Sequence, residues 1–105
     1  MDNVAAFLRY LSSEKNYSTH TIRAYSKDID SFATHCSDAY GLRNLEKAHF
    51  TMLRDYIISL SKRGLTMRSI NRKFSALKSL YTYFQKIGII EVHPYAKHKA
   101  VKAKK

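Results

Sequence analysis

Residues 64–88 read GLTMRSINRKFSALKSLYTYFQKIG and form the most regular part of the sequence. At about 100° per residue, the large apolar side chains of this stretch fall on one stripe of a helix. They are Ile70, Phe74, Leu77, Tyr81 and Phe84. The opposite side carries Arg68, Arg72, Ser75, Ser79, Thr82 and Lys86, and the stretch contains no acidic residue. A solvated helix face usually mixes charges of both signs, because like charges repel each other. We therefore expect this helix to pack by its apolar stripe and to offer a polyanion its basic, hydroxyl-rich side.

A second amphipathic stretch begins at Ser18, a good N-cap residue, and is predicted to run to about Ser37. Its apolar side consists of Ile22, Tyr25, Ile29, Phe32, Ala33 and Cys36. Its other side carries His20, Arg23, Lys27 and Thr34, with Asp30 among them. Arg23 and Lys27 lie one turn apart, as do Arg68 and Arg72, so that a basic row could follow a phosphate backbone. The free N–H groups at the start of this helix could also hold a phosphate near Ser18.

Two further helices complete the expected fold. The first starts after Asp2 or Asn3 and frays near Glu14, and the third spans about His49 to Arg63. Their predicted inward residues are Val4, Phe7, Leu8 and Leu11 in the first, and Leu53, Tyr56, Ile57 and Leu60 in the third. A connector over 38–47 is expected to turn at Gly41 and to be anchored by Leu42 and Leu45. The last helix is expected to start at an N-cap Thr66 and to end at Gly88, with Ile89 and Ile90 folding back on the core before Pro94. Because three glycines and one proline are the only breakers and strand-like alternation is lacking, the sequence predicts an all-α fold.

The composition indicates one globular domain with a strong positive charge. The chain has 105 residues and a formal net charge of +11, of which five charges are lysines within residues 97–105. Such an excess favours nucleic acid as partner, then an anionic membrane surface, then plain solubility. The single cysteine, Cys36, excludes an internal disulfide and fits a reducing compartment. With no apolar run of membrane-spanning length and no secretory pattern, we expect a cytoplasmic protein without membrane attachment.

No pattern in the sequence indicates catalysis. The five histidines are scattered without metal-ligand spacing, and neither a glycine-rich phosphate loop nor a nucleophile arrangement occurs. We therefore expect no metal, no cofactor and no enzymatic activity from this chain. Asp28 and Asp55 lie near core-facing edges and are expected to cap a helix or to pair with basic groups.

Three segments resemble motifs of the tyrosine recombinases. Residues 17–29, YSTHTIRAYSKDI, resemble their S-x-x-T-x-x-x-Y-x-x-D-L helix. Residues 64–81 resemble their G-L-S-x-x-S-I-N-R-x-L-S-A-L-R-S-F-Y helix, and residues 88–94, GIIEVHP, are similar to G-x-I-x-x-N-P. The three matches occur in order and cover essentially the whole chain. The chain thus resembles the N-terminal core-binding domain of a phage-integrase or Xer-like recombinase.

This resemblance implies a four-helix SAM-like orthogonal bundle of the lambda-integrase N-terminal type over residues 1–95. Residues 96–105 would begin the linker to a catalytic domain that carries the catalytic arginines, lysine, histidine and tyrosine. The two domains would close around double-stranded DNA like a clamp, with the second and fourth helices at the major groove. By position, the groove-facing residues would be His20, Thr21, Arg23, Ala24, Lys27, Arg68, Ser69, Arg72 and Ser75. The implied function is non-catalytic, sequence-preferring DNA binding in site-specific DNA integration and recombination. Other recombinase protomers in a synaptic complex would be partners, and the isolated domain would be a monomer.

Two residues depart from the family pattern, and three other functions stay open. His93 stands where asparagine usually precedes the proline, and His49 where a Thr or Ser cap is usual. The first alternative is a helical protein-interaction module whose basic face receives an acidic partner. The second is an RNA-binding helical domain, which the inward-pointing aromatics disfavour. The third, membrane attachment, is disfavoured because no helix would expose a broad apolar side.

Overall fold

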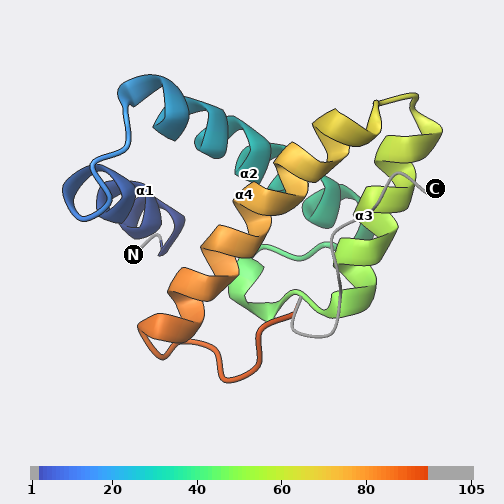
Figure 1. Cartoon of the computed structure of the whole chain (residues 1–105). Helices are drawn as coiled ribbons and strands as arrows, with labels where there is room; N and C mark the ends of the chain where they lie inside the picture. Colours follow the sequence, from blue (N-terminus) through green and yellow to red (C-terminus); the bar gives the residue numbers. More distant parts are fainter. Residues whose placement is uncertain (1–2, 95–105) are drawn as a thin grey trace.

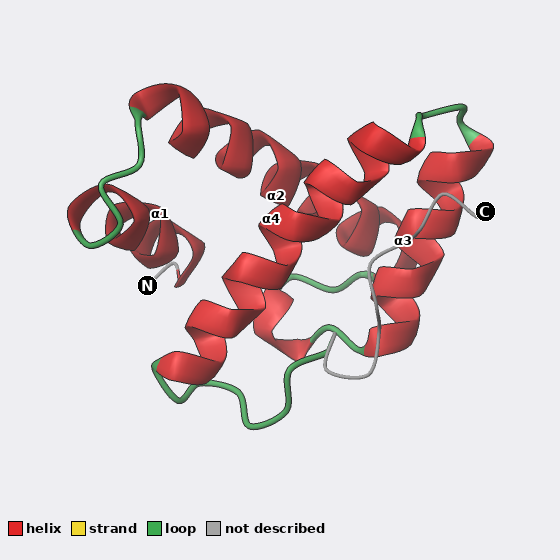
Figure 2. Ribbon diagram, in the orientation of Figure 1, coloured by secondary structure: helices red, strands yellow, loops and turns green. Residues whose placement is uncertain are grey.

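The computed structural model describes residues 3–94, and within that range the chain is helical with no strand. The elements are α1 (Asn3–Ser13), α2 (Thr19–Tyr40), a single 3₁₀ turn η1 (Leu45–Lys47), α3 (Phe50–Lys62) and α4 (Met67–Lys86). Figures 1 and 2 show α4 crossing α2, with α1 on one side of the crossing and α3 on the other. The predicted all-α fold with four helices is confirmed.

The helix boundaries follow from local capping chemistry. Ser18 Oγ accepts a hydrogen bond from the backbone N–H of Thr21 at 3.2 Å, and Thr66 Oγ1 accepts one from that of Ser69 at 3.2 Å. Each bond satisfies one of the N–H groups that a helix start leaves free. The other end of α2 lies three residues beyond the predicted Ser37, because the left-handed conformation that stops it occurs only at Gly41, where φ is 68°.

The core is built from one stripe of each helix. All five residues of the predicted α4 stripe are buried, and so are the four predicted for α3. Tyr81 is fully buried in the core, and its hydroxyl donates a hydrogen bond to the backbone oxygen of Leu45 at 2.6 Å, which ties the α2–α3 connector to α4.

After α4, Ile90 packs against the core as expected, whereas Ile89 stays exposed, so the prediction for Ile89 was wrong. Ile89 belongs to the turn that ends α4, where its backbone N–H binds the oxygen of Phe84 at 3.1 Å.

The arrangement leaves one side of α2 and one side of α4 open to solvent. The buried stripe of α4 contacts α1, α2 and α3, so the helix is enclosed on that side only. α2 buries Ile29, Phe32 and Cys36 against its neighbours. Most of the basic side chains of both long helices therefore lie on the outside.

Candidate nucleic-acid interface

The outward face of α2 carries most of its predicted site residues. His20, Arg23, Ala24 and Lys27 are all exposed. Thr21 is half-buried, and its hydroxyl lies 3.0 Å from Ser18 Oγ, so this side chain belongs to the N-cap of the helix as well as to its face.

The outward face of α4 has a similar composition. Arg68, Arg72 and Ser75 are exposed. Ser69 is half-buried; its backbone N–H donates a hydrogen bond to Thr66 Oγ1 at 3.2 Å, and its hydroxyl accepts one from Thr66 at 3.2 Å. All nine predicted positions are thus at least partly accessible, while Thr21 and Ser69 also serve the caps.

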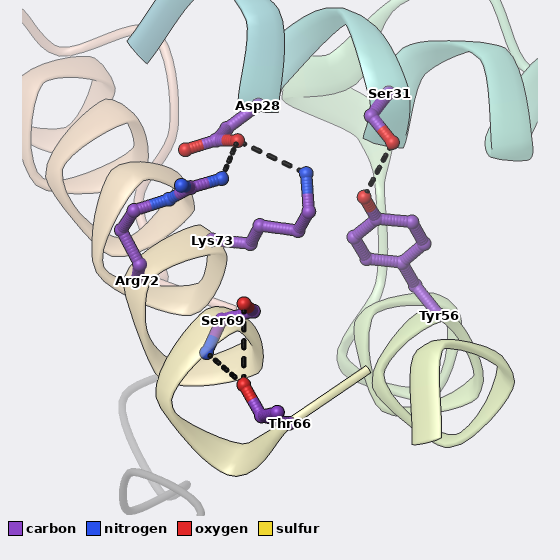
Figure 3. A network of polar contacts seen from close by, with 7 residues as sticks. All are labelled: Asp28, Ser31, Tyr56, Thr66, Ser69, Arg72 and Lys73. Atoms are coloured by element: carbon purple, nitrogen blue, oxygen red, sulfur yellow. Dashed lines mark hydrogen bonds and ion pairs between the residues drawn. The ribbon is translucent and has the colours of Figure 1, made fainter. Parts of the chain in front are cut away.

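A buried carboxylate connects the two faces. Asp28 of α2 accepts hydrogen bonds at 3.0 Å from Arg72 Nη2 and at 3.0 Å from Lys73 Nζ, both through Oδ1 (Figure 3). The side chain of Asp28 is 4% exposed and that of Lys73 is 16% exposed, whereas Arg72 exposes 61% of its side chain. A guanidinium group has five N–H donors, so Arg72 keeps donors for a ligand while one nitrogen is held by Asp28. Arg72 therefore links α4 to α2 through an ion pair and is at the same time an exposed cation.

A second contact sets how the helices pass each other. Tyr25 of α2 is hydrogen-bonded to Ser79 of α4; burial raises the pKa of Tyr25, and the bond to Ser79 acts against that rise. Tyr25 thus meets Ser79, while Asp28, further along α2, meets Arg72, which comes earlier in α4. The two helices consequently run past each other in opposite senses.

The interface has little negative charge to offset its cations. Among residues 3–94, the only ion pairs are the two made by Asp28, so Arg23, Lys27 and Arg68 have no described carboxylate partner. The prediction that Asp28 pairs with basic groups is confirmed. The prediction for Asp55 was wrong: its carboxylate accepts a hydrogen bond from the Tyr40 hydroxyl at 2.7 Å, and this bond raises the pKa of Tyr40. Tyr40 is in contact with Asp55 because α2 extends to Tyr40, three residues beyond its predicted end at Ser37.

Sequence reasoning missed that Arg72 has a fixed partner. The available signal was the position of Asp28, which lies next to Ile29 at the edge of a buried stripe, and of Arg72 and Lys73 just before Phe74. A carboxylate at such an edge needs a cation from a neighbouring helix, because an unpaired buried charge is costly. Which helix supplies the cation depends on the crossing of α2 and α4, which the sequence alone does not give.

Within residues 3–94, the structure contains neither a metal-ligand cluster nor a membrane-spanning helix. No group of three or more His, Cys, Asp or Glu side chains within residues 3–94 could hold a metal ion. Cys36 is buried, and burial raises the pKa of its thiol to about 11. None of the helices in this range is both long and apolar enough to cross a membrane.

Comparisons with known proteins show the family of this chain. The profile of the family described as "Phage integrase, N-terminal SAM-like domain" matches residues 4–86. The chain belongs to this family. Three relatives, all named Tyrosine recombinase XerC, resemble this SAM-like domain over most of its length. The protein of Bacillus subtilis is 35% identical over 92 residues, which are 88% of the chain and 30% of the relative.

The other two relatives give a similar picture. The protein of Lacticaseibacillus casei is 32% identical over 95 residues, or 90% of the chain and 32% of the relative. That of Oceanobacillus iheyensis is 32% identical over 92 residues, or 88% of the chain and 30% of the relative. The chain thus spans about a third of the length of the curated relatives it matches. No solved structure matches this SAM-like domain. The expected boundary at residue 95 and the basic tail over 96–105 lie outside the described residues.

Proposed function

We propose that this SAM-like domain binds double-stranded DNA with the outward faces of α2 and α4, as a non-catalytic DNA-binding part of a site-specific tyrosine recombinase. One observation carries the proposal: buried Asp28 of α2 binds Arg72 and Lys73 of α4, which fastens together the two helices that carry the exposed basic residues. Within residues 3–94, Arg23, Lys27 and Arg68 make no ion pair with a carboxylate. The nine residues named above form the contact surface. In a recombinase of this kind, the groups that cut and rejoin DNA would belong to a separate catalytic domain, and other protomers would join this one in a synaptic complex. Alone, the domain would be a monomer.

The proposed contact follows from the size and chemistry of the faces. The major groove of B-DNA is about 12 Å wide and admits an α-helix. Arg68 and Arg72 lie one turn apart on α4, where a guanidinium could bind a guanine edge or a phosphate by two parallel hydrogen bonds. On α2, Arg23 and Lys27 form a matching row, and His20 lies near the positive end of the helix dipole. Their side chains are suited to the backbone phosphates that position a protein on the duplex.

The direct test reverses a charge on the proposed face. Arg23→Glu should weaken binding to a duplex at least tenfold, because Arg23 is exposed and bound to no other described side chain. Arg54→Glu is the matched control, since Arg54 is also an exposed cation but lies on α3. We expect its affinity to stay within about twofold of the wild type, measured by fluorescence anisotropy at fixed salt. Equal losses in both variants would show that only net charge matters, and would contradict the proposal.

Arg72 needs a different substitution. Glutamate there would place a second carboxylate beside buried Asp28 and would disturb the fold as well as the surface. Arg72→Gln leaves Lys73 as the partner of Asp28, so a fall in DNA affinity with unchanged helical circular dichroism would report the contact itself.

The choice of nucleic acid is also testable. The major groove of A-form RNA is deep and narrow and does not admit a helix. Duplex RNA should therefore compete with labelled duplex DNA at least tenfold less well than unlabelled DNA of the same sequence. Equal competition would favour the RNA-binding alternative.

A further inference from the structure

A cleft of about 240 Å³ lies between α1, the α1–α2 loop and the second half of α4. Lysines line it from two directions: Lys15 comes from the loop, and Lys78 and Lys86 come from α4. Its lining includes no acidic residue, and none of these lysines has a described carboxylate partner. Three cations around an opening of this kind favour an anion.

The floor of the cleft is aromatic and fixes one lysine. The rings of Tyr10 and Tyr83 lie with their centroids 4.8 Å apart, and both line the cleft. Lys86 Nζ donates a hydrogen bond to the hydroxyl of Tyr10 at 3.3 Å and lies 5.1 Å from the centroid of its ring. This cation–π contact holds the ammonium group in place while leaving two of its three N–H donors for a ligand. The Tyr10 hydroxyl, which accepts from Lys86, can donate its own hydrogen to the same ligand.

The rim opposite α4 is set by a special backbone conformation. Asn16 has a φ of 56°, the left-handed region that asparagine tolerates better than other non-glycine residues. The turn that it makes lets the backbone N–H of Tyr17 bond to the oxygen of Leu11 at 3.0 Å. Lys15 and Tyr17, on either side of Asn16, are thereby brought to the cleft.

The position of the cleft along α4 indicates which anion it meets. Lys86 follows Arg72 by fourteen residues on the same polar side, a distance of about 21 Å along the helix at 1.5 Å per residue. The major groove is only about 12 Å wide, so a helix with Arg72 at the groove carries Lys86 beyond the groove wall. What lies there is the sugar–phosphate backbone.

We propose that this lysine cleft binds a backbone phosphate of the DNA that flanks the segment contacted by Arg68 and Arg72. The proposal rests on the proposed function, because it needs a duplex lying along α2 and α4. The cleft would add affinity and fix the angle of α4 on the duplex without reading sequence, since phosphates are the same at every step. It adds Lys15, Lys78 and Lys86, none of which belongs to the nine predicted residues, to the contact surface.

The test measures how affinity depends on salt. Each neutralised phosphate contributes about −0.9 to the slope of log K against log salt, and about five or six contacts on the two helix faces give a slope near −5. The triple variant Lys15→Gln, Lys78→Gln, Lys86→Gln should have a slope less steep by about 1, because the cleft binds one phosphate. The matched control is Lys47→Gln, Arg54→Gln, Lys62→Gln, which removes three exposed positive charges elsewhere and should keep the wild-type slope.

A second probe removes the charge from the DNA instead. Uncharged methylphosphonate linkages placed in the flank should weaken binding of the wild type, and should weaken binding of the cleft variant several-fold less. Equal sensitivity of the two proteins, or a wild-type salt slope in the cleft variant, would overturn the cleft proposal. If Arg23→Glu still weakened binding in that case, the proposed function would stand without the cleft. A wild-type chain that failed to bind the duplex at all would overturn both.

Discussion

At the scale of single residues, Asp28 both joins α2 to α4 and orients a cation at the surface. Its carboxylate is almost inaccessible and receives hydrogen bonds from two cations of α4. Lys73 is itself largely buried, so it depends on Asp28 for compensation of its charge. The guanidinium group of Arg72, by contrast, is oriented by its hydrogen bond to Asp28 and remains largely exposed to solvent. One side chain of α2 therefore decides where a surface cation of α4 points.

We predict that Asp28→Asn lowers the free energy of unfolding by about 1–3 kcal/mol, since Lys73 keeps a hydrogen-bond acceptor but loses its counterion. Urea denaturation followed by circular dichroism measures this change. Asp30→Asn, on the exposed side of the same helix, should stay within about 0.5 kcal/mol of the wild type. Similar losses in the two variants would show that the ion pairs do not contribute to stability.

His93 supplies a prediction about pH. Burial lowers its pKa below the ordinary 6.5, while the hydrogen bond to the backbone oxygen of Lys78 acts in the opposite direction. The unfolded chain therefore binds a proton more readily at this residue than the folded chain. The contribution of His93 to stability is complete above its ordinary pKa and is lost as the pH falls through the lowered, folded value.

The measurement compares thermal unfolding of the wild type and of His93→Asn between pH 7.5 and pH 5. The melting temperature of the wild type should fall more steeply toward acid than that of the variant, because the variant has no proton to take up at this position. Parallel curves would mean that residue 93 does not titrate differently in the two states.

At the scale of the elements, the sequence predicts most of what is observed. The stripes of α3 and α4 are complete, because their apolar residues keep helical spacing and enter a single core. The caps at Ser18 and Thr66 were also predictable, since capping depends on residues within one turn. The end of α2 was not, because nothing between Ser37 and Tyr40 forces a helix either to stop or to continue. The Asp28–Arg72 pair, the Tyr40–Asp55 bond and the lysine cleft depend on how helices cross, which no local pattern specifies.

A prediction for α4 concerns its first turn. Thr66→Ala should reduce the free energy of unfolding by about 1 kcal/mol, because the N–H of Ser69 loses the oxygen that it binds. Thr51→Ala is the control: Thr51 is an exposed threonine in the first turn of α3, and its side chain makes no described hydrogen bond. Urea denaturation of both variants should show a lower free energy of unfolding only for Thr66→Ala. A loss in Thr51→Ala as large as that in Thr66→Ala would show that the cap is not its cause.

At the scale of the whole molecule, the charge is distributed unevenly among the helices. α2 and α4 carry the outward basic residues. α1 and the loop after it form the lysine cleft together with α4. α3 packs against α4. A duplex lying across α2 and α4 would thus meet cations over a length greater than the width of one groove. Sequence preference would come from the residues near the crossing, and salt-dependent affinity from the whole surface.

The central claim, that the outward faces of α2 and α4 form one duplex-binding surface, is most directly tested by titrating the ¹⁵N-labelled chain with duplex DNA and following its amide resonances. We expect the largest shifts over residues 18–27 and 66–86, together with Lys15 and Tyr17, and little change on the outer side of α3 around Arg54. Shifts centred on α3, or spread evenly over all four helices, would contradict it.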